Sequence, residues 1–353
     1  MSNLILNSTI ISDTIYYIIC AGLSSLILLG IYLMSKVKTA IFGNFLSAGC
    51  LTIGVIVTLV KYNALPLWII YISLLIGAII GIYLAYKVKM IQMPQLVALL
   101  NGIGGGASFI VGIFAVYEIG AGSDLFSKIT AYIAILVGII TLLGSLVAAG
   151  KLHQILTQKP VVIKNHQLYT ILTLLLTVIS IIIGIVLDSI SPIIPILLTT
   201  IFGGAFGILF TIRVGGADMP ITISLLNSFS GVAGAIAGLA ISDLLLVSVG
   251  GIVGSSGLLL TQIMCKAMNR NLMDILLGKT TITLKQSSKE EIVIPKQEEK
   301  VKDESYIDLI KNAKDVIIAP GYGMAIAQAQ HLVKALADKL KANGAKVRYA
   351  IHP

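Results

Sequence analysis

The chain has 353 residues, of which 57% are hydrophobic and only 12% are charged, and its mean hydropathy is +0.98. A soluble domain averages about 25% charged residues, so this composition excludes a soluble enzyme, a disordered tail and a disulfide scaffold. Residues 1–273 hold 12 of the 25 Lys and Arg and 6 of the 16 Asp and Glu. We therefore predict a long membrane part followed by a short water-soluble part.

The cysteines and the positive charge indicate no further class of chemistry. Cys20, Cys50 and Cys265 form no C-x-x-C pair, so we interpret them as small apolar residues. The formal net charge of +9 does not indicate nucleic-acid binding, because the basic residues flank apolar segments, where they determine membrane topology. We assign no metal ligands. We also expect no cleavable signal peptide, because no basic region precedes the first apolar run.

Nine apolar runs are long enough to cross a bilayer, which takes about 20 residues of helix. They lie at 15–34, 40–60, 66–86, 95–117, 129–149, 168–187, 192–212, 221–241 and 244–264. Only Ser242 and Asp243 separate the last two runs, but one helix from 221 to 264 would be far too long for a bilayer. The fold prediction is therefore an all-α polytopic membrane bundle of nine transmembrane helices.

The basic residues in the loops predict the orientation of this bundle. One set of alternate loops carries Lys36 and Lys38, Lys87 and Lys89, Lys151, Lys159 and Lys164, Arg213, and Lys266 and Arg270. The other set carries only Lys61 and Lys128 among its basic residues. The positive-inside rule then places the N-terminus outside and the C-terminus in the cytoplasm. An odd number of spans requires the same result.

The last part of the chain predicts a different kind of fold. Residues 279–304 are polar and mixed in charge, which is typical of a tether. From 306 the pattern indicates a short helix, a strand at 315–319, a glycine turn, a helix of about twenty residues and a strand at 346–352. This is the first βαβ unit of a Rossmann-like α/β domain. One such unit cannot cover both faces of its sheet, so we expect the sequence to be truncated within a larger domain.

Two of the membrane segments repeat one motif. Met, Pro, Leu, Leu and Asn occur at 93, 94, 99, 100 and 101, and again 126 residues later at 219, 220, 225, 226 and 227. Both segments start from the cytoplasmic side, so the repeat is parallel, and repeats often bracket a central pathway. Asn101 and Asn227 each lie about 10 Å deeper than their proline, where lipid cannot satisfy an amide. Two interpretations stay open: the amides hold helices together, or they line a polar, water-bearing path.

Other residues of the membrane part are also open to two interpretations. Asp218, directly before the second Met-Pro, either caps the eighth span or relays protons at its cytoplasmic mouth. Glycines at 102–106 and 250–257 indicate close helix packing, and Ser255 either belongs to that packing or lines a wet path. We interpret His153 and His166 as loop residues and expect no buried Lys, Arg or His in any span.

The glycine turn carries a weak dinucleotide-binding pattern. Gly321, Tyr322, Gly323, Met324, Ala325, Ile326 and Ala327 follow a predicted strand and open a helix. Gly321 permits the tight turn, Gly323 lets the backbone approach a pyrophosphate, and the helix N-terminus supplies N–H groups. The second strand ends at Tyr349-Ala350-Ile351-His352 without the acid that an NAD site presents to the ribose, which favours NADP. His352 is either a residue of the strand end or a ligand contact.

Five stretches resemble one family. They are Gly215-Gly216-Ala217-Asp218-Met219-Pro220, Leu226-Asn227-Ser228, Val253-Gly254-Ser255-Ser256-Gly257, Met264-Cys265-Lys266-Ala267-Met268-Asn269-Arg270 and Pro320-Gly321-Tyr322-Gly323-Met324-Ala325. They closely resemble the beta subunit of the proton-translocating NAD(P) transhydrogenase, nearly end to end. The resemblance implies a transmembrane proton-translocating domain at 1–273, a linker at 274–305 and an incomplete cytoplasmic NADP-binding domain at 306–353.

The resemblance also implies an activity and a partner. An alpha subunit would bind NAD(H) and pass hydride to NADP(H) bound here, while protons returning through the membrane part drive the reaction towards NADPH. The hetero-oligomer would dimerise in the inner (plasma) membrane, with the C-terminal domain in the cytoplasm. With one βαβ unit, this chain is expected to bind NADP(H) weakly or not at all. No residue is assigned a catalytic role, because the cofactors carry the hydride chemistry.

By the same resemblance, Asp218, Asn227 and Ser255 match polar positions of the family's proton path, and Asn101 departs from it. Many members have a histidine where this sequence has Asn101, and an amide cannot take up a proton near neutral pH. Either a neighbouring membrane subunit supplies the histidine, which we favour, or the path uses water held by amides. The alternative function is a secondary ion or solute transporter whose cytoplasmic domain senses nucleotides.

Overall fold

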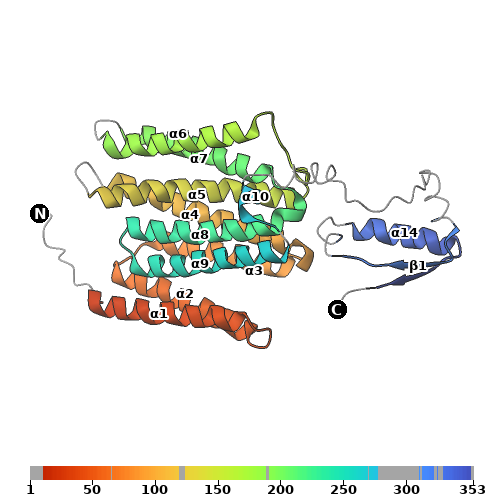
Figure 1. Cartoon of the computed structure of the whole chain (residues 1–353). Helices are drawn as coiled ribbons and strands as arrows, with labels where there is room; N and C mark the ends of the chain where they lie inside the picture. The colour runs from red at the N-terminus through yellow and green to blue at the C-terminus, as the bar shows by residue number, and fades with distance from the viewer. Residues whose placement is uncertain are drawn as a thin grey trace, which may run out of the picture.

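The structure, a computed structural model, describes residues 11–64, 66–118, 124–187, 191–268, 270–276, 310, 312–321, 324 and 329–350. Within these residues, nine helices are long and apolar enough to cross a membrane. They are α1 (Asp13–Met34), α2 (Ala40–Lys61), α3 (Trp68–Lys87), α4 (Met93–Glu118), α5 (Leu125–Leu152), α6 (His166–Val186), α7 (Ile193–Ile212), α8 (Met219–Ala240) and α9 (Leu244–Ala267). Figure 1 shows them aligned side by side. The predicted number of spans and their approximate positions are confirmed.

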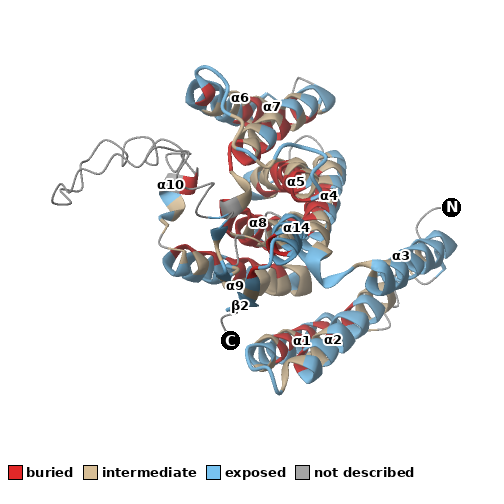
Figure 2. Ribbon diagram, turned by 90° about the vertical axis from the view of Figure 1, so that its right-hand side faces the viewer, coloured by how far each residue is buried: buried red, intermediate tan, exposed pale blue. Residues whose placement is uncertain are grey.

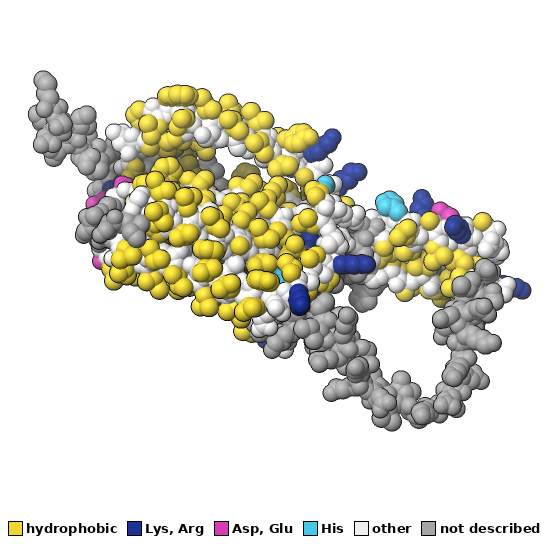
Figure 3. Space-filling view, turned by 90° about the horizontal axis from the view of Figure 1, so that it is seen from above, with side chains coloured by type: hydrophobic (Ala, Val, Ile, Leu, Met, Phe, Trp, Pro, Cys, Tyr) yellow, Lys and Arg dark blue, Asp and Glu magenta, His cyan; other side chains and the backbone are white. Residues whose placement is uncertain are grey.

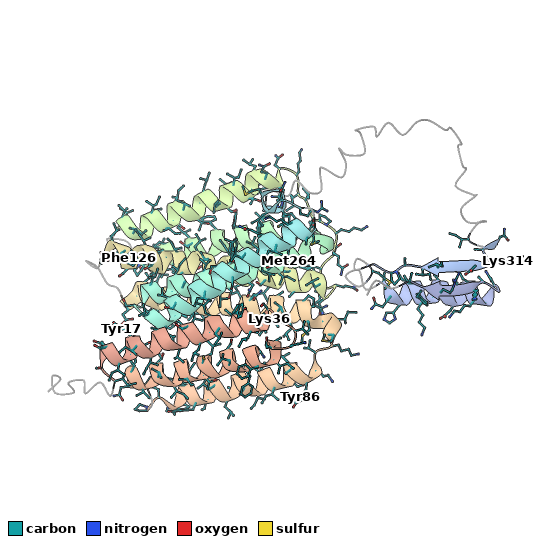
Figure 4. The ribbon with its side chains drawn as sticks, turned by 60° about the horizontal axis from the view of Figure 1, so that its bottom comes forward. Tyr17, Lys36, Tyr86, Phe126, Met264 and Lys314 are labelled. Atoms are coloured by element: carbon teal, nitrogen blue, oxygen red, sulfur yellow. The ribbon has the colours of Figure 1, made fainter. Side chains whose placement is uncertain are left out.

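Odd-numbered helices run in one direction along the bundle. Tyr17, near the start of α1, and Phe126, near the start of α5, lie at one end (Figure 4). Tyr86, at the end of α3, and Met264, near the end of α9, lie toward the other end (Figure 4). Helices that follow one another in the sequence therefore run antiparallel, as they must in a chain that spans a bilayer repeatedly.

The boundary between α8 and α9 lies where the sequence predicted it. Ser242 has a φ of 57°, in the left-handed region, which ends α8. Asp243 then caps α9, because its Oδ1 accepts a hydrogen bond from the backbone N–H of Leu246 at 2.7 Å. Its Oδ2 accepts a hydrogen bond from the hydroxyl of Tyr16 in α1 at 3.1 Å. One buried carboxylate thus starts α9 and attaches α1 to it.

Burial is concentrated in α4, α5, α7 and α8 (Figure 2). One apolar cluster joins residues of α4, α5, α8 and α9 at the end of the bundle next to a short tenth helix, α10 (Leu272–Leu276). It comprises Ala98, Ala148, Leu152, Val214, Met219, Ile221, Ile223, Leu226, Cys265 and Ile275. At the periphery, α3 has no buried residue. Large apolar side chains cover the outer surface, and the Lys and Arg side chains lie mainly toward one end of it (Figure 3).

The internal repeat of the sequence is also a repeat of structure. A 3-10 turn, η1 (Met90–Gln92), leads into α4, and a second turn, η2 (Gly216–Asp218), leads into α8. Both helices begin with Met-Pro, in which proline occupies the first turn, where its missing N–H leaves no hydrogen bond unmade. Each repeat is completed by the helix that follows, α5 or α9.

Matched glycines hold each pair of helices together at close range. A Cβ at Gly105 of α4 would lie 2.6 Å from Cβ of Thr141 in α5. A Cβ at Gly231 of α8, the matched position, would lie 2.4 Å from the backbone nitrogen of Gly254 in α9. No other residue fits at such distances. The helix-packing interpretation of these glycines is therefore correct.

The C-terminal part holds a small parallel sheet. Strand β1 (Asp315–Ile318) pairs in parallel with β2 (Lys346–Tyr349), with Asp315 opposite Lys346. The described helix between them, α14 (Gln330–Ala342), packs on β2 and ends before Gly344, which has a φ of 86°. The strands are shorter than predicted. Six residues of the connection after β1, 322–323 and 325–328, lie outside the described residues.

Two expectations about polar residues are wrong. Lys151 belongs to the last turn of α5 and is fully buried, and His166 is the first residue of α6 and is 4% exposed. α5 ends three residues after the apolar run that predicted it, and α6 begins two residues before its run, so in each case a basic residue assigned to a loop lies inside the protein. The cause is physical: backbone carbonyls satisfy both side chains, and the hydropathy of the sequence carries no trace of those partners.

Gly231→Ala should destabilise the bundle. The added methyl group has to push apart the α8 and α9 backbones, and overpacking of this kind costs about 1–3 kcal/mol. Gly251→Ala in α9 is the matched control, because a Cβ there meets nothing within 4 Å. Thermal unfolding of the purified protein in detergent measures both. Equal melting temperatures for the two variants would contradict the close approach.

Candidate functional site

Asn101 is buried and reaches from one repeat to the other. It lies in α4, is 7% exposed, and its Nδ2 donates a hydrogen bond to the backbone oxygen of Ile223 in α8 at 3.3 Å. This bond is what the helix-holding interpretation requires. The amide therefore joins the two Met-Pro helices at Ile223, four residues before Asn227. Asn227 itself is partly buried in α8.

The contact between α8 and α9 is polar and its hydroxyl groups are paired. Ser228 Oγ donates a hydrogen bond to the backbone oxygen of Gly254 at 2.6 Å. One turn closer to the start of α8, Thr261 Oγ1 of α9 lies 3.0 Å from Ser224 Oγ. Thr261 also donates to the backbone oxygen of Gly257 at 2.8 Å. These bonds fix α8 against α9.

Two buried hydroxyl groups beside α5 have no hydrogen-bond partner within the described part of the chain. Ser145 Oγ of α5 faces α4, since a Cβ at Gly102 would lie 3.0 Å from Ser145 Cβ, next to Asn101. Thr211 Oγ1 of α7 faces Gly144 of α5. A buried hydroxyl without a protein partner is a place where water can bind. Neither residue could be predicted from the sequence, because Ser and Thr are common inside apolar helices.

Ser255 does not join this buried layer. It lies on the exposed face of α9, and its Oγ donates to the backbone oxygens of Gly251 at 2.8 Å and Ile252 at 3.1 Å of the same helix. Within the described residues, the structure therefore brings together the helices of Asn101 and Asn227 but leaves Ser255 on the outside.

Asp218 lies at the start of α8 and forms an ion pair with Arg270. Arg270 Nε is 3.2 Å from Asp218 Oδ1, and the two side chains are 30% and 10% exposed. The attraction is electrostatic, since Oδ1 receives no well-directed hydrogen bond. Asp218 occupies the N-cap position of α8, although its carboxylate makes no capping hydrogen bond. The ion pair also links the start of α8 to the segment that leaves α9.

Lys151 is a fully buried ammonium group held by three carbonyl oxygens. Its Nζ donates to the backbone oxygens of Val214 at 2.8 Å, of Lys159 at 3.3 Å, and of Ile212, the last residue of α7. The three N–H groups thus have three acceptors, and the negative end of the α7 dipole faces the charge. Sequence analysis missed this role.

Lys151 connects the segment after α5 to the segment after α7, and these two segments also bind one another. Val161 N donates to Ile212 O at 3.2 Å, and Gly216 N donates to Gln158 O at 2.9 Å. Arg213 lies between these bonds, and burial lowers its pKa from the ordinary value, although an arginine remains charged. The segment that leads into Asp218 is therefore fixed by backbone hydrogen bonds and one buried lysine.

The glycine turn is only partly within the described residues. Gly321 and Met324 are described: Met324 N donates to Gly321 O at 3.0 Å, which forms a tight turn after β1. A Cβ at Gly321 would meet nothing within 4 Å, so the turn borders open space. The other residues predicted to bind the cofactor, Tyr322, Gly323, Ala325, Ile326 and Ala327, lie outside the described residues. Among the residues searched, no group of three or more His, Cys, Asp or Glu could hold a metal ion.

Comparison with known proteins shows which family has a sequence like that of this chain. Residues 15–353 match the family of the NAD(P) transhydrogenase beta subunit. Two relatives from Rhodospirillum rubrum, one of them from a defined strain, are named NAD(P) transhydrogenase subunit beta; each is 35% identical over 344 residues. The aligned part covers 96% of this chain and 73% of each relative.

The chain belongs to the NAD(P) transhydrogenase beta subunit family. The family match includes the nine-helix bundle, Asp218, Arg270 and the two-stranded C-terminal sheet, so one family accounts for both parts of the chain. The family resemblance inferred from the five stretches of sequence is confirmed.

Lys151→Met should destabilise the protein. The variant leaves carbonyl oxygens of Val214 and Lys159 without a donor, and each buried group left unpaired costs about 1–3 kcal/mol. Lys266→Met is the matched control, because Lys266 also lies in the last turn of its helix but is exposed. The melting temperature in detergent should fall for Lys151→Met and stay near the wild-type value for Lys266→Met; an unchanged value for both would refute the structural role.

Proposed function

We propose that this chain is a subunit of a proton-translocating NAD(P) transhydrogenase. It couples hydride transfer, between NAD(H) on a partner alpha subunit and NADP(H) bound here, to proton movement through the nine-helix bundle. The family match over residues 15–353 carries this proposal. The buried hydroxyl groups of Ser145 and Thr211 support it, because they have no protein partner among the described residues and can bind water.

The placement in the cell follows from the charges of the loops. The N-terminus lies outside and the C-terminal domain in the cytoplasm, with the protein in the inner membrane. Residues 1–273 form the transmembrane domain, 274–305 the linker and 306–353 the first part of the NADP-binding domain. The complex with the alpha subunit is a hetero-oligomer that dimerises. The end of the bundle that carries most of the Lys and Arg side chains is its cytoplasmic end (Figure 3).

The proton route lies where the two repeats meet. Asn101 and Asn227 provide amides at matching depths, and the unpaired hydroxyl groups of Ser145 and Thr211 beside α5 provide sites for water. Water held by such groups carries protons without a charged side chain in the membrane centre. Asp218 is the carboxylate at the cytoplasmic end. Ser255 lies on the outer face of α9, so it contributes to this route only if the route passes along that face.

The Asp218–Arg270 pair makes the coupling conformational. A proton on Asp218 removes the charge that attracts Arg270, and Arg270 lies between α9 and α10, on the way to the linker. The segment then moves independently of α8, which changes how the C-terminal domain holds NADP(H). The coupling is reciprocal: tighter NADP(H) binding in one state favours the protonation state of Asp218 that accompanies it.

The residues of the glycine turn fit a dinucleotide. Gly321 borders open space after β1, and 321–327 provide the backbone that would hold the pyrophosphate of NADP(H). The described end of β2, Tyr349 and Ala350, offers no acid to a ribose hydroxyl, in keeping with a phosphorylated ribose. When bound, NADP(H) supplies or accepts the hydride. The described residues here form two strands and one helix, and we expect the chain to bind NADP(H) weakly or not at all.

The secondary-transporter alternative is not favoured, since the family match covers the whole bundle together with the C-terminal sheet. The two functions differ in what the proton gradient does. In a transhydrogenase the gradient drives hydride transfer, whereas in a transporter it drives the movement of a solute.

Collapsing the proton gradient should slow NADPH formation. Vesicles that contain both full-length subunits reduce an NADP analogue with NADH, and the absorbance of the reduced analogue reports the rate. An uncoupler should lower the rate several-fold when the vesicles are energised. A rate that ignores the gradient would reject the coupled function, and uptake of a solute by the beta subunit alone would support the transporter.

Asn227→Leu should abolish proton coupling and retain NADP(H) binding. Leucine is close to asparagine in size but cannot hold water, so the polar route is interrupted in α8 while the C-terminal domain is untouched. Asn44→Leu is the matched control, because Asn44 is exposed in α2. The energised rate should fall at least about tenfold for Asn227→Leu only, a barrier increase of about 1.4 kcal/mol. NADP(H) affinity, measured by calorimetry on the complex, should be unchanged.

A further inference from the structure

Helix α3 borders a space that no other described helix fills. It has no buried residue and makes no extended contact with another described helix, although it runs the length of the bundle. Figure 2 shows it at the edge of the bundle, outside the helices in which burial is concentrated. Lipid tails are as apolar as leucine side chains, so they are suitable neighbours for the surface that α3 leaves uncovered.

A cavity of about 380 Å³ lies between the end of α3, the start of α4 and the end of α5, and it is open to the outside. Its polar lining residues, Gln92, Gln95 and His153, form a mouth where the helices begin and end. Its apolar floor includes Leu99, four residues beyond Gln95, and Leu146, seven residues before His153. These spacings are rises of about 6 and 10 Å along a helix. The cavity therefore has a polar mouth at the end of the bundle and an apolar floor inside it.

The size of the cavity fits an extended apolar chain. A methylene group takes about as much room as a molecule of liquid water, about 30 Å³, so the cavity has room for about twelve of them. A helix about 10 Å across fills about 800 Å³ over a depth of about 10 Å, which is about twice the volume of the cavity. One acyl chain therefore fills this space better than a transmembrane helix does.

Hydrogen bonds hold the mouth in one shape. Gln95 Nε2 donates to the backbone oxygen of Leu152 at 3.0 Å, and Gln95 Oε1 lies 3.0 Å from His153 Nδ1, so the start of α4 is joined to the end of α5. At η1, the backbone N–H of Lys89 donates to Gln92 Oε1 at 3.1 Å. The N–H groups on Nε2 of Gln92 remain as donors. The mouth thus has a fixed shape and offers an amide donor.

The charges beside the mouth are positive. Lys87 and Lys89 stand on either side of Val88, a lining residue, and both lysines are exposed. In the described part of the chain, no Asp or Glu lines the cavity. In the proposed orientation this end of the bundle is cytoplasmic, and anionic lipids of that leaflet attract lysines beside membrane helices. An anionic headgroup matches the mouth as an acyl chain matches the floor.

We propose that the space between α3, α4 and α5 binds one anionic phospholipid. One acyl chain lies along the floor between Leu99 and Leu146. The phosphate lies at the mouth, where Lys87, Lys89 and Nε2 of Gln92 donate to its oxygens. The bound lipid joins α3 to the rest of the bundle. This inference takes its leaflet from the proposed orientation, but it does not depend on hydride transfer or on proton movement.

Photolabelling tests the site in the assembled protein. The complex of both full-length subunits is placed in phosphatidylcholine vesicles that contain a small fraction of photoreactive phosphatidylglycerol or, in a parallel sample, photoreactive phosphatidylcholine. Each probe carries a diazirine on one acyl chain. After illumination and digestion, mass spectrometry measures the labelling of residues 96–99 and 146–150. We expect the anionic probe to label them at least about tenfold more than the zwitterionic probe.

The double variant Lys87→Gln, Lys89→Gln tests the headgroup. It should remove most of the preference for phosphatidylglycerol, because each lysine near an anionic lipid contributes about a fivefold change in affinity. The double variant Lys36→Gln, Lys38→Gln is the matched control, since it removes two exposed lysines from the loop between α1 and α2. The control should label like the wild type. Identical labelling of the two double variants would reject the headgroup assignment.

Leu99→Trp tests the acyl chain. The indole ring occupies part of the floor, so labelling of residues 146–150 should fall several-fold with either probe. Leu100→Trp is the matched control, because Leu100 is the next residue of α4, is 50% exposed and does not line the cavity. A Leu99→Trp complex that labels like the control would place the chain elsewhere and overturn the proposal.

The wild-type complex decides the question even if a variant does not assemble. Equal labelling by the two probes would reject an anionic ligand. A floor that neither probe labels would show that another occupant, such as a helix of the alpha subunit, fills the space, and this would also overturn the proposal. Because labelling requires no catalysis, a complex that fails as a coupled transhydrogenase can still bind the lipid, and the two proposals are tested separately.

Discussion

The ion pair between Asp218 and Arg270 is the contact on which the proposed communication between the bundle and the C-terminal unit depends. It joins the start of α8, the helix of Asn227, to the segment that leaves α9 for the linker. The Asp218 side chain is 10% exposed and that of Arg270 is 30% exposed, so the pair is only partly accessible to water. The buried Lys151 and the backbone bonds of the neighbouring segment keep Asp218 in place. In the proposed mechanism, a change of charge on Asp218 therefore acts on Arg270.

Comparison of the two repeats explains why the ion pair occurs in the second repeat only. Gln92 in η1 and Asp218 in η2 occupy matching positions, 126 residues apart, and each precedes a Met-Pro helix. In the second repeat a carboxylate meets a guanidinium. In the first, the polar link between the two helices is the contact of 3.0 Å between Gln95 Oε1 and His153 Nδ1. The two repeats thus differ in the charged groups at this end.

The sequence predicted most of the fold because the physical signals for it are local. Hydropathy over about 20 residues found every described span, and Ser242 with Asp243 divided α8 from α9 correctly. The site was less predictable. Lys151 and His166 were assigned to loops because their partners are backbone carbonyls of residues far along the chain. Ser145 gave no signal for the same reason: whether its hydroxyl is paired depends on α4, which the pattern around Ser145 does not describe.

The buried polar groups are of two kinds, those with a hydrogen-bond partner in the protein and those without one. The first kind marks the rigid regions of the bundle, and the second marks regions that can adapt. Lys151, His166 and the hydroxyl groups between α8 and α9 have protein acceptors at hydrogen-bonding distance, so moving them means breaking those bonds inside an apolar medium. Ser145 and Thr211 lack such partners. Because lipid offers no replacement, the first class holds the helices in register while only the second accommodates water. Ser145 lies on α5 toward α4, and Thr211 lies on α7 toward α5. The proposed coupling requires a proton route beside helices that are held rigidly. If those helices moved easily, a change of one charge on the route would be absorbed locally and would not reach the C-terminal domain.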